Sequence, residues 1–333
     1  MNFLVVRQHN QIGDMLCSLS LYAAIKKRYP DSHITLVAAN TNYEIPFKEI
    51  NPYIDRVLIF DKSSLKTILL FYKELRKLKY DFGIVPSTIV LSRTSHIINF
   101  LSGAKNRVGV KTIDGQLNQS HKYLNIKSDF NWKGKHQLQR NLEIVRQINF
   151  DLTDEELSEI KFSFNTDEIN FAEKYLADYF SDRTKKIIAF HPGAGKTANT
   201  WSTENFISII ERLYGQYQNN ILITSGWTDT LITEKISNAL SEKKIPFTIL
   251  HNCPVKKLGA ILKRCDLYIT NDTGTMHIAG FSGAKMISLF GPTEPDEWAP
   301  KGINQISIKS KTGLINDICV EEVFAQCKLI LNK

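Results

Sequence analysis

The chain has 333 residues, of which 43% are hydrophobic and 23% are charged. This length suits two domains of ordinary size, and the absence of any run of eighteen apolar residues argues against a membrane-spanning protein. The apolar start at residues 1–7 is too short for a signal peptide and follows no basic region, so we expect it to form a first β-strand.

The five cysteines show neither C-x-x-C spacing nor neighbouring histidines, and their number is odd. This pattern predicts reduced thiols in a cytoplasmic protein and no structural metal.

Short apolar runs alternate with helical patterns through the first half of the chain. The runs at 3–6, 34–38, 57–60 and 82–85 are typical of strands buried in a parallel sheet, and the patterns at 14–29 and 64–79 predict helices. Asp14 follows the first strand, and two roles are open for it. It caps the first helix, or its carboxylate faces a crevice between two domains and takes a proton from an attacking hydroxyl.

The net charge of +8 is concentrated in residues 105–140, where eight basic side chains face only Asp114 and Asp129. Such a segment attracts a polyanion, which could be nucleic acid, an anionic membrane surface or a phosphorylated glycolipid. The plainer alternative is a basic surface with no specific partner. Aromatic residues are not interleaved as in nucleic-acid modules, which argues against nucleic acid. The basic residues are Lys105, Arg107, Lys111, Lys122, Lys127, Lys133, Lys135 and Arg140.

After an acidic stretch at 151–170 the strand pattern restarts, with runs at 187–190, 221–224, 247–250, 267–270 and 286–290 and a closing helix at 319–331. Two successive alternations of strand and helix predict two doubly wound α/β domains. Ligands are then expected at the carboxyl ends of the strands.

A glycine-rich loop from His191 to Lys196 follows the first strand of the second half. It is not a P-loop, because the first glycine of that motif is replaced by Phe190. It also fits G-x-G-x-x-A, but no acidic residue closes the next strand, so a dehydrogenase is not expected. The remaining interpretation is a loop whose N–H groups and lysine hold a pyrophosphate.

The segment 270–279 starts a helix directly after a strand, where free N–H groups and the helix dipole favour a phosphate. Thr273, Thr275 and His277 add donors beside Gly274. Asp272 would repel a phosphate, so it caps the helix or accepts hydrogen bonds from ligand hydroxyls. Donors beside an acceptor suggest a nucleotide-sugar, and an ordinary capped helix is the plainer alternative.

Five segments, at 12–14, 102–109, 191–194, 271–277 and 290–295, together resemble glycosyltransferase family 9, the heptosyltransferases. The resemblance implies an α/β protein of GT-B fold, with two Rossmann-like doubly wound domains facing a central cleft. Residues 1–165 would bind the acceptor, residues 180–318 the donor, and residues 319–333 would form a helix that packs back across the domains.

The resemblance implies an inverting transfer of heptose from ADP-heptose to the inner core of lipopolysaccharide or lipooligosaccharide, without metal or cofactor. Asp14 corresponds to the base, Thr273, Gly274 and His277 to the pyrophosphate site, and Asp272 to a contact of the donor sugar. The expected donor-binding residues are His191, Gly193, Ala194, Gly195, Lys196, Asp229, Asp272, Thr273, Gly274, Thr275 and His277.

The implied acceptor is an anionic glycolipid, Kdo-lipid A or the heptosylated core, at the cytoplasmic surface of the inner membrane. Lys105, Arg107 and Lys111 are expected to bind it, and no nucleic acid is expected. The sequence departs from the family in having Asn199, where a lysine is usual, two residues before Trp201. The ribose contact falls to Asp229.

Three alternatives stay open: a family 9 enzyme with another donor or acceptor, a non-catalytic nucleotide-sugar binding protein, and an epimerase of similar architecture. Asp14 after Gly13 favours transfer, because binding alone needs no base.

Overall fold

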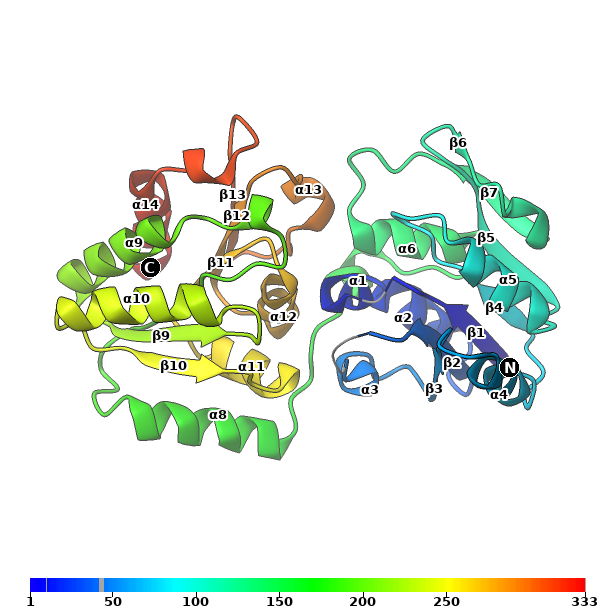
Figure 1. The fold of residues 1–333 in the computed structure, drawn as a ribbon, viewed down its shortest axis with the longest axis horizontal. Helices are drawn as coiled ribbons and strands as arrows, with labels where there is room; N and C mark the ends of the chain where they lie inside the picture. The colour runs from blue at the N-terminus through cyan, green and yellow to red at the C-terminus, as the bar shows by residue number, and fades with distance from the viewer. Residues whose placement is uncertain (10, 42–44, 333) are drawn as a thin grey trace. The chain divides into compact units, whose positions relative to one another are not determined.

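The computed structural model describes residues 1–9, 11–41 and 45–332. The chain divides into two compact units, Met1–Ile160 and Lys161–Lys333, and each is built on one central sheet with helices on both faces (Figure 1). The second unit therefore includes residues 166–179, which lie between the two expected domains, as well as the closing helix.

The sheet of the N-terminal unit has the strand order β3-β2-β1-β4-β5-β6, with β7 also paired to β5. Its pairs are parallel apart from β5 with β6. The strands are β1 (Asn2–Val6), β2 (His33–Ala39), β3 (Arg56–Phe60), β4 (Phe82–Ile84), β5 (Asn106–Ile113), β6 (Gln116–Leu117) and β7 (Ile126–Phe130).

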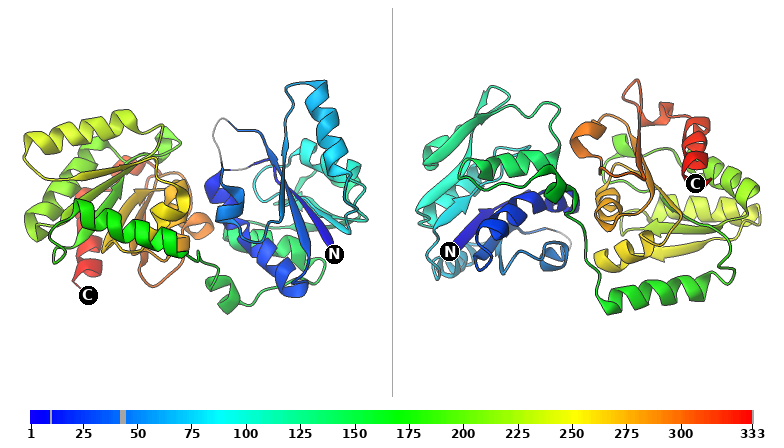
Figure 2. Two further views of the ribbon diagram at one scale, coloured as in Figure 1. Left: turned by 90° about the horizontal axis from the view of Figure 1, so that it is seen from below. Right: turned by 180° about the vertical axis from the view of Figure 1, so that it is seen from behind.

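Helices cover both faces of this sheet. Helix α2 packs on α6, while α4 and α5 lie over β3 and β1 (Figures 1 and 2). The helices are α1 (Ile12–Cys17), α2 (Leu19–Arg28), α3 (Phe47–Ile50), α4 (Leu65–Leu75), α5 (Arg93–Leu101), α6 (Gln137–Arg146) and α7 (Asp154–Ser158), with the 3₁₀ turn η1 (His121–Tyr123).

The first helix is interrupted, although the sequence predicts one helix over 14–29. Ser18 separates α1 from α2, and its hydroxyl donates to the carbonyl of Met15 at 2.7 Å. A serine hydroxyl bonded back to its own helix competes with the helical hydrogen bonds and commonly bends the chain. The short α1, which contains Asp14, is therefore a helix separate from α2.

The sheet of the C-terminal unit has the order β10-β9-β8-β11-β12-β13 and is parallel throughout. Its central strands are mostly apolar and are buried along almost their whole length, as expected for strands covered on both faces. The strands are β8 (Ile187–His191), β9 (Asn220–Ser225), β10 (Thr248–His251), β11 (Leu267–Asn271), β12 (Met286–Phe290) and β13 (Gln305–Lys309).

The closing helix, α14, packs on α9, β11 and β12 of its own unit and adds Val323, Phe324 and Cys327 to the core. On the other side of the sheet, α11 contacts both α8 and α12. The helices are α8 (Thr166–Tyr179), α9 (Thr203–Tyr217), α10 (Thr230–Glu242), α11 (Val255–Leu262), α12 (Gly274–Ser282), α13 (Pro295–Trp298) and α14 (Val320–Leu331), with η2 (Thr197–Asn199) and η3 (Ile315–Asp317).

Each sheet has one place where the chain order reverses, between β1 and β4 in the first and between β8 and β11 in the second. Loops leaving the carboxyl ends of such neighbouring strands diverge, and open α/β sheets bind their ligands there. The residues expected to be functional should therefore lie after these four strands.

None of the helices within the described ranges combines the length and apolar character needed to cross a membrane. All five cysteines are free thiols.

Candidate functional site

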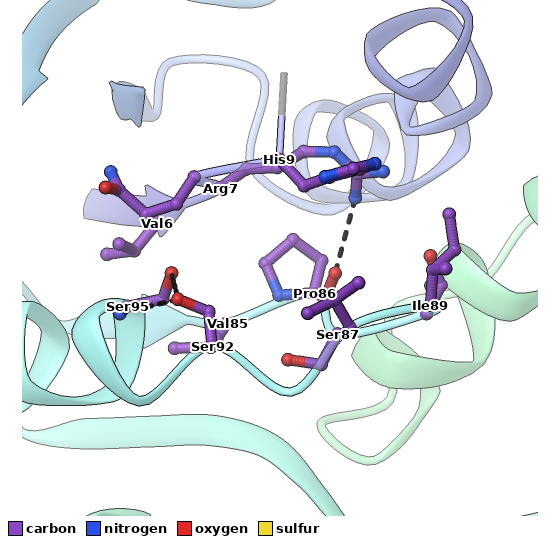
Figure 3. A pocket seen from close by; sticks show the side chains of 12 residues that line it. Val6, Arg7, His9, Val85, Pro86, Ser87, Ile89, Ser92 and Ser95 are labelled. Carbon is purple, nitrogen blue, oxygen red and sulfur yellow. Dashed lines mark hydrogen bonds between the residues drawn. The ribbon is translucent and has the colours of Figure 1, made fainter. Parts of the chain in front are cut away.

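A pocket of about 170 Å³ opens at the reversal point of the N-terminal sheet. One wall is formed by the residues that follow β1, among them Arg7 and His9, and the other by residues 85–90 after β4 (Figure 3). Ser87, Thr88 and Ser92 give the lining hydroxyl groups, so the pocket suits a polar ligand with hydroxyls of its own.

Arg7 is buried at the base of this pocket. Its guanidinium donates to the carbonyl of Pro86 at 3.3 Å and to the side-chain oxygen of Asn141 at 3.2 Å. Asn141 is itself fixed, because its amide nitrogen donates to the carbonyls of Cys17 and Gln137. Hydrogen bonds to Pro86, after β4, and to Asn141, on α6, therefore fix the guanidinium independently of any carboxylate.

Asp14 lies beside Arg7, with 3.6 Å between Oδ1 and Nη2, and its side chain is only 4% exposed. It is the third residue of α1, and the N-cap position belongs to Gln11, so the N-cap alternative for Asp14 is wrong. Asp14 Oδ2 lies 3.1 Å from Nε2 of His9, whose side chain is half exposed. Within the described residues, Oδ1 accepts no hydrogen bond.

The basic residues expected to bind the acceptor are not gathered around Asp14. Lys105 precedes β5, and Arg107 is its second residue, in register with Gly83 of β4 and Leu4 of β1. Both therefore lie toward the amino ends of the parallel strands, whereas Asp14 follows the carboxyl end of β1. Lys111 lies further along β5 and pairs with Asp129 at 3.2 Å.

The second site begins with the glycine-rich loop after β8. The Nδ1 atom of His191 lies within 3.1 Å of the carbonyl and hydroxyl oxygens of Thr224, and burial lowers the pKa of His191. Asn271, at the end of β11, donates to the carbonyls of Pro192 and Gly193 and accepts from the N–H of Trp201. One amide thus ties both ends of the loop to the reversal point.

Asp229 is buried behind this loop, at the N-cap position of α10. Its carboxylate accepts the N–H of Gly226 at 2.7 Å and lies 3.7 Å from Nε2 of His191. A Cβ atom on Gly193 would fall 2.2 Å from the Asp229 carboxylate, so only glycine fits at that position. Ala194, Gly195 and Lys196 continue the loop toward solvent.

The helix start expected to bind phosphate is present and uncapped. Thr273 is the N-cap of α12, and its side chain makes no capping hydrogen bond. Gly274 and Thr275, which form its first turn, are partly exposed. His277 is buried next to the ring of Trp298, with 6.2 Å between ring centroids.

Asp272 does not cap α12, so that alternative is wrong. Its Oδ2 accepts the hydroxyl of Thr293 at 2.5 Å and the amide of Asn199 at 3.0 Å. Burial raises the pKa of Asp272, while the Thr293 hydrogen bond and the nearby Lys196 cation oppose this rise. The carboxylate is therefore fixed beside the helix start, where it can accept hydrogen bonds from a ligand.

Three residues of this site were not singled out by the sequence: Asn271, Thr293 and Lys309. Lys309 Nζ donates to the carbonyls of Gly291 and Thr293 and lies 3.0 Å from Glu294. It lies on β13, the strand that pairs with β12, and holds the loop that follows β12. Asn271 lies in the motif segment 271–277 and Thr293 in the segment 290–295, so membership of these segments was the available signal. Over the described ranges, no three His, Cys, Asp or Glu side chains are grouped as a metal ion would require.

Comparison with known proteins identifies the family of this chain. The family model of glycosyltransferase family 9 (heptosyltransferase) matches residues 68–325. A lipooligosaccharide heptosyltransferase 2 from Campylobacter jejuni is 25% identical over 87% of this chain and 81% of its own length. The enzyme of the same name from Haemophilus influenzae is 26% identical over 90% of this chain and 86% of its own.

Solved structures show the same fold. The Escherichia coli ADP-heptose lps heptosyltransferase II superposes with a TM-score of 0.78 at 18% identity, covering 100% of this chain and 99% of that one. A family 9 glycosyltransferase from Veillonella parvula gives 0.81 at 19% identity, covering 99% and 97%. A UDP-GlcNAc 2-epimerase from Methanocaldococcus jannaschii shares the fold more distantly, with a TM-score of 0.58 at 12% identity, covering 100% and 93%.

The family model spans more than half of the chain, and two parallel-sheet units are the architecture of the heptosyltransferase structures. The protein therefore belongs to glycosyltransferase family 9, the heptosyltransferases, and is a glycosyltransferase of GT-B fold.

Proposed function

We propose that the protein is an inverting glycosyltransferase that transfers heptose from ADP-heptose to the inner core of lipopolysaccharide or lipooligosaccharide. The observation that carries this proposal is the uncapped start of α12, which lies between the glycine-rich loop and the fixed carboxylate of Asp272. The donor class is supported by two Escherichia coli structures of similar fold, solved with ADP and with ADP-2-deoxy-2-fluoro heptose.

In this proposal the C-terminal unit holds the donor. The diphosphate lies at the N-terminus of α12, where Gly274 and Thr275 offer N–H groups and the helix dipole favours negative charge. Negative charge grows on the leaving diphosphate in the transition state, and fixed N–H donors stabilise it without reorganisation. Asp272, held by Thr293 and Asn199, accepts hydrogen bonds from the sugar hydroxyls.

The N-terminal unit supplies the base. The proposed base is Asp14, which removes the proton of the acceptor hydroxyl as that oxygen attacks the anomeric carbon. Asp14 Oδ2 lies 3.1 Å from Nε2 of His9, and His9 in turn lines the pocket. Arg7 acts as a positioning residue, because Pro86 and Asn141 fix its guanidinium against Asp14.

The proposed acceptor is an anionic glycolipid at the cytoplasmic face of the inner membrane. The hydroxyl-rich pocket after β1 and β4 suits the sugar part of such a molecule. Lys111 lies on the carboxyl half of β5 and is the one of the three expected basic residues on the side of the sheet where the pocket opens.

The test is donor turnover with and without a lipid acceptor. Purified protein is incubated with ADP-heptose and either deacylated or intact Kdo-lipid A, and release of ADP is followed. Release that depends on acceptor supports transfer. Stabilisation by ADP-heptose without any turnover would favour a binding protein, and conversion of the donor without acceptor would favour an epimerase.

A further inference from the structure

Helix α4 presents three leucines to solvent. Leu65 is 80% exposed, Leu69 is 71% exposed and Leu70 is 51% exposed. Residues four apart lie on the same side of a helix, so Leu65 and Leu69 form one apolar strip along the outer face. The helix lies on the outside of the N-terminal unit (Figure 2).

These leucines are not needed for the fold of the unit. The inner face of α4 is formed by Phe71 and Leu75, which are buried in the N-terminal core, with Ile68 packed against it. An ordinary surface helix would carry polar residues opposite such a face. A row of exposed leucines on a helix that already has a full inner face marks a contact surface.

The charge around the strip is positive. Segment 61–79 contains six basic residues and only two acidic ones, Asp61 and Glu74. Glu74 is neutralised by Arg56 at 3.0 Å and Lys77 at 2.6 Å. Lys66 and Lys73 are exposed on the same outer face as the leucines. The surface is therefore both apolar and cationic.

The neighbouring helix extends this surface. Arg76 Nε donates to the carbonyl of Leu101 at 3.2 Å, which places the carboxyl ends of α4 and α5 side by side. Phe100, in the last turn of α5, is half exposed and lies under the guanidinium of Arg107. Lys105, whose side chain is 77% exposed, follows directly. The basic residues that lie away from Asp14 thus border the α4 surface.

We propose that the outer face of α4 is a docking surface for an anionic lipid bilayer. Leu65, Leu69 and Leu70 enter the boundary between headgroups and acyl chains, and the lysines of 61–79 extend to the lipid phosphates. The positive charge is what selects an anionic bilayer over an apolar protein partner. The inference rests on the proposed function in one respect: a glycolipid acceptor gives the protein a reason to contact a membrane.

Vesicle flotation tests the proposal directly. Full-length protein is mixed with vesicles of phosphatidylcholine alone or with 30 mol% phosphatidylglycerol, and the bound fraction is measured. The variant L69Q/K73Q removes one leucine and one lysine from the outer face. Loss of one leucine contact weakens partitioning roughly tenfold, and loss of one lysine about fivefold. We expect a loss on the order of fiftyfold.

The matched control is L231Q/K235Q on α10, which removes a leucine that is 76% exposed and an exposed lysine at the same spacing. It should bind vesicles as the parent protein does. Equal binding of both variants, or equal binding to the two kinds of vesicle, would overturn the proposal. A parent protein that is dimeric without lipid, with L69Q/K73Q monomeric, would instead identify a second copy as the occupant and also overturn it.

Turnover with deacylated acceptor separates this inference from the proposed function. L69Q/K73Q should keep normal turnover on that soluble substrate while losing vesicle binding. Vesicle binding without any transfer would support the docking surface and contradict the proposed function. Transfer without vesicle binding would support the proposed function and contradict the docking surface.

Discussion

Replacing Asp14 with asparagine should affect both catalysis and stability, because the carboxylate is one half of a buried ion pair. The asparagine amide would keep the size of the side chain but could neither accept a proton from the acceptor nor balance Arg7. As a general base contributes about 10²–10⁴-fold, turnover should fall by roughly that factor. The stability effect follows from the surroundings of Arg7.

Both side chains of the Arg7–Asp14 pair are only 4% exposed. Removing one partner of a buried pair costs about 3–5 kcal/mol, because the other charge remains buried without compensation. Arg7 keeps its hydrogen bonds to Pro86 and Asn141, so the low end applies. A loss of about 3 kcal/mol corresponds to a fall in melting temperature of roughly 6–12 °C for a unit of this size.

The assay combines thermal unfolding, ADP affinity and turnover at a temperature where the variant is folded. Arg7→Met in the Asp14→Asn background should recover part of the stability, since the unpaired cation is gone, without recovering turnover. ADP affinity should be unchanged in every variant, because the proposed donor residues belong to the other unit. A folded Asp14→Asn enzyme with turnover within threefold of the parent would remove Asp14 from the mechanism. A melting temperature of Asp14→Asn within 2 °C of the parent would show that the buried Arg7–Asp14 pair does not stabilise the fold as described.

Three further outcomes are expected. Gly193→Ala should weaken ADP binding at least tenfold and cost roughly 1–3 kcal/mol of stability, because its Cβ would fall 2.2 Å from the Asp229 carboxylate. The control Gly195→Ala should bind ADP normally, because no atom of the described structure lies within 4 Å of its Cβ position. Trp227 is 81% exposed after β9, at the carboxyl end of the sheet proposed to hold the donor. If its ring stacks on the adenine base, changing it to alanine should raise the Kd for ADP by roughly 5- to 150-fold, measured by calorimetry. Burial lowers the pKa of His96, so the unfolded state binds the extra proton first and stability should fall as pH drops below about 6.5, by at most ~1.4 kcal/mol per pH unit from this residue. His96→Gln should reduce this slope in urea unfolding, and the buried His191 should still contribute to it.

The sequence predicted the strands that form apolar runs, including the edge strands β3 and β10, and missed strands that carry polar positions. Strands β1, β2, β8, β11 and β12 are covered on both faces and read as continuous apolar runs, which the hydrophobic pattern detects. Strands β5, β7 and β13 lie toward sheet edges and include polar positions such as those of Ile126–Phe130, so no apolar run marks them. The two-unit α/β architecture survives these omissions because it depends on the central strands.

The same distinction applies to the sites. The loop after β8 and the helix start after β11 were predictable because they are local segments that follow recognisable strands. The ion pair between Arg7 and Asp14 could not be read from the sequence, because it depends on Asn141 reaching back from α6 to fix the guanidinium. The contact of Lys309 with the loop after β12 likewise depends on the pairing of β13 beside β12. Motifs show which segments are functional, whereas tertiary contacts determine which charges are balanced.

The departure at position 199 changes how the charges of the donor site are balanced. A lysine there would bring a cation to Asp272 or to the diphosphate, whereas Asn199 only donates hydrogen bonds to Asp272. The nearby cation is instead Lys196, three residues earlier, on the exposed part of the loop. An exposed ammonium is screened by water and contributes less than a buried one. In the proposed reaction, more of the leaving charge is then stabilised by the N-terminus of α12.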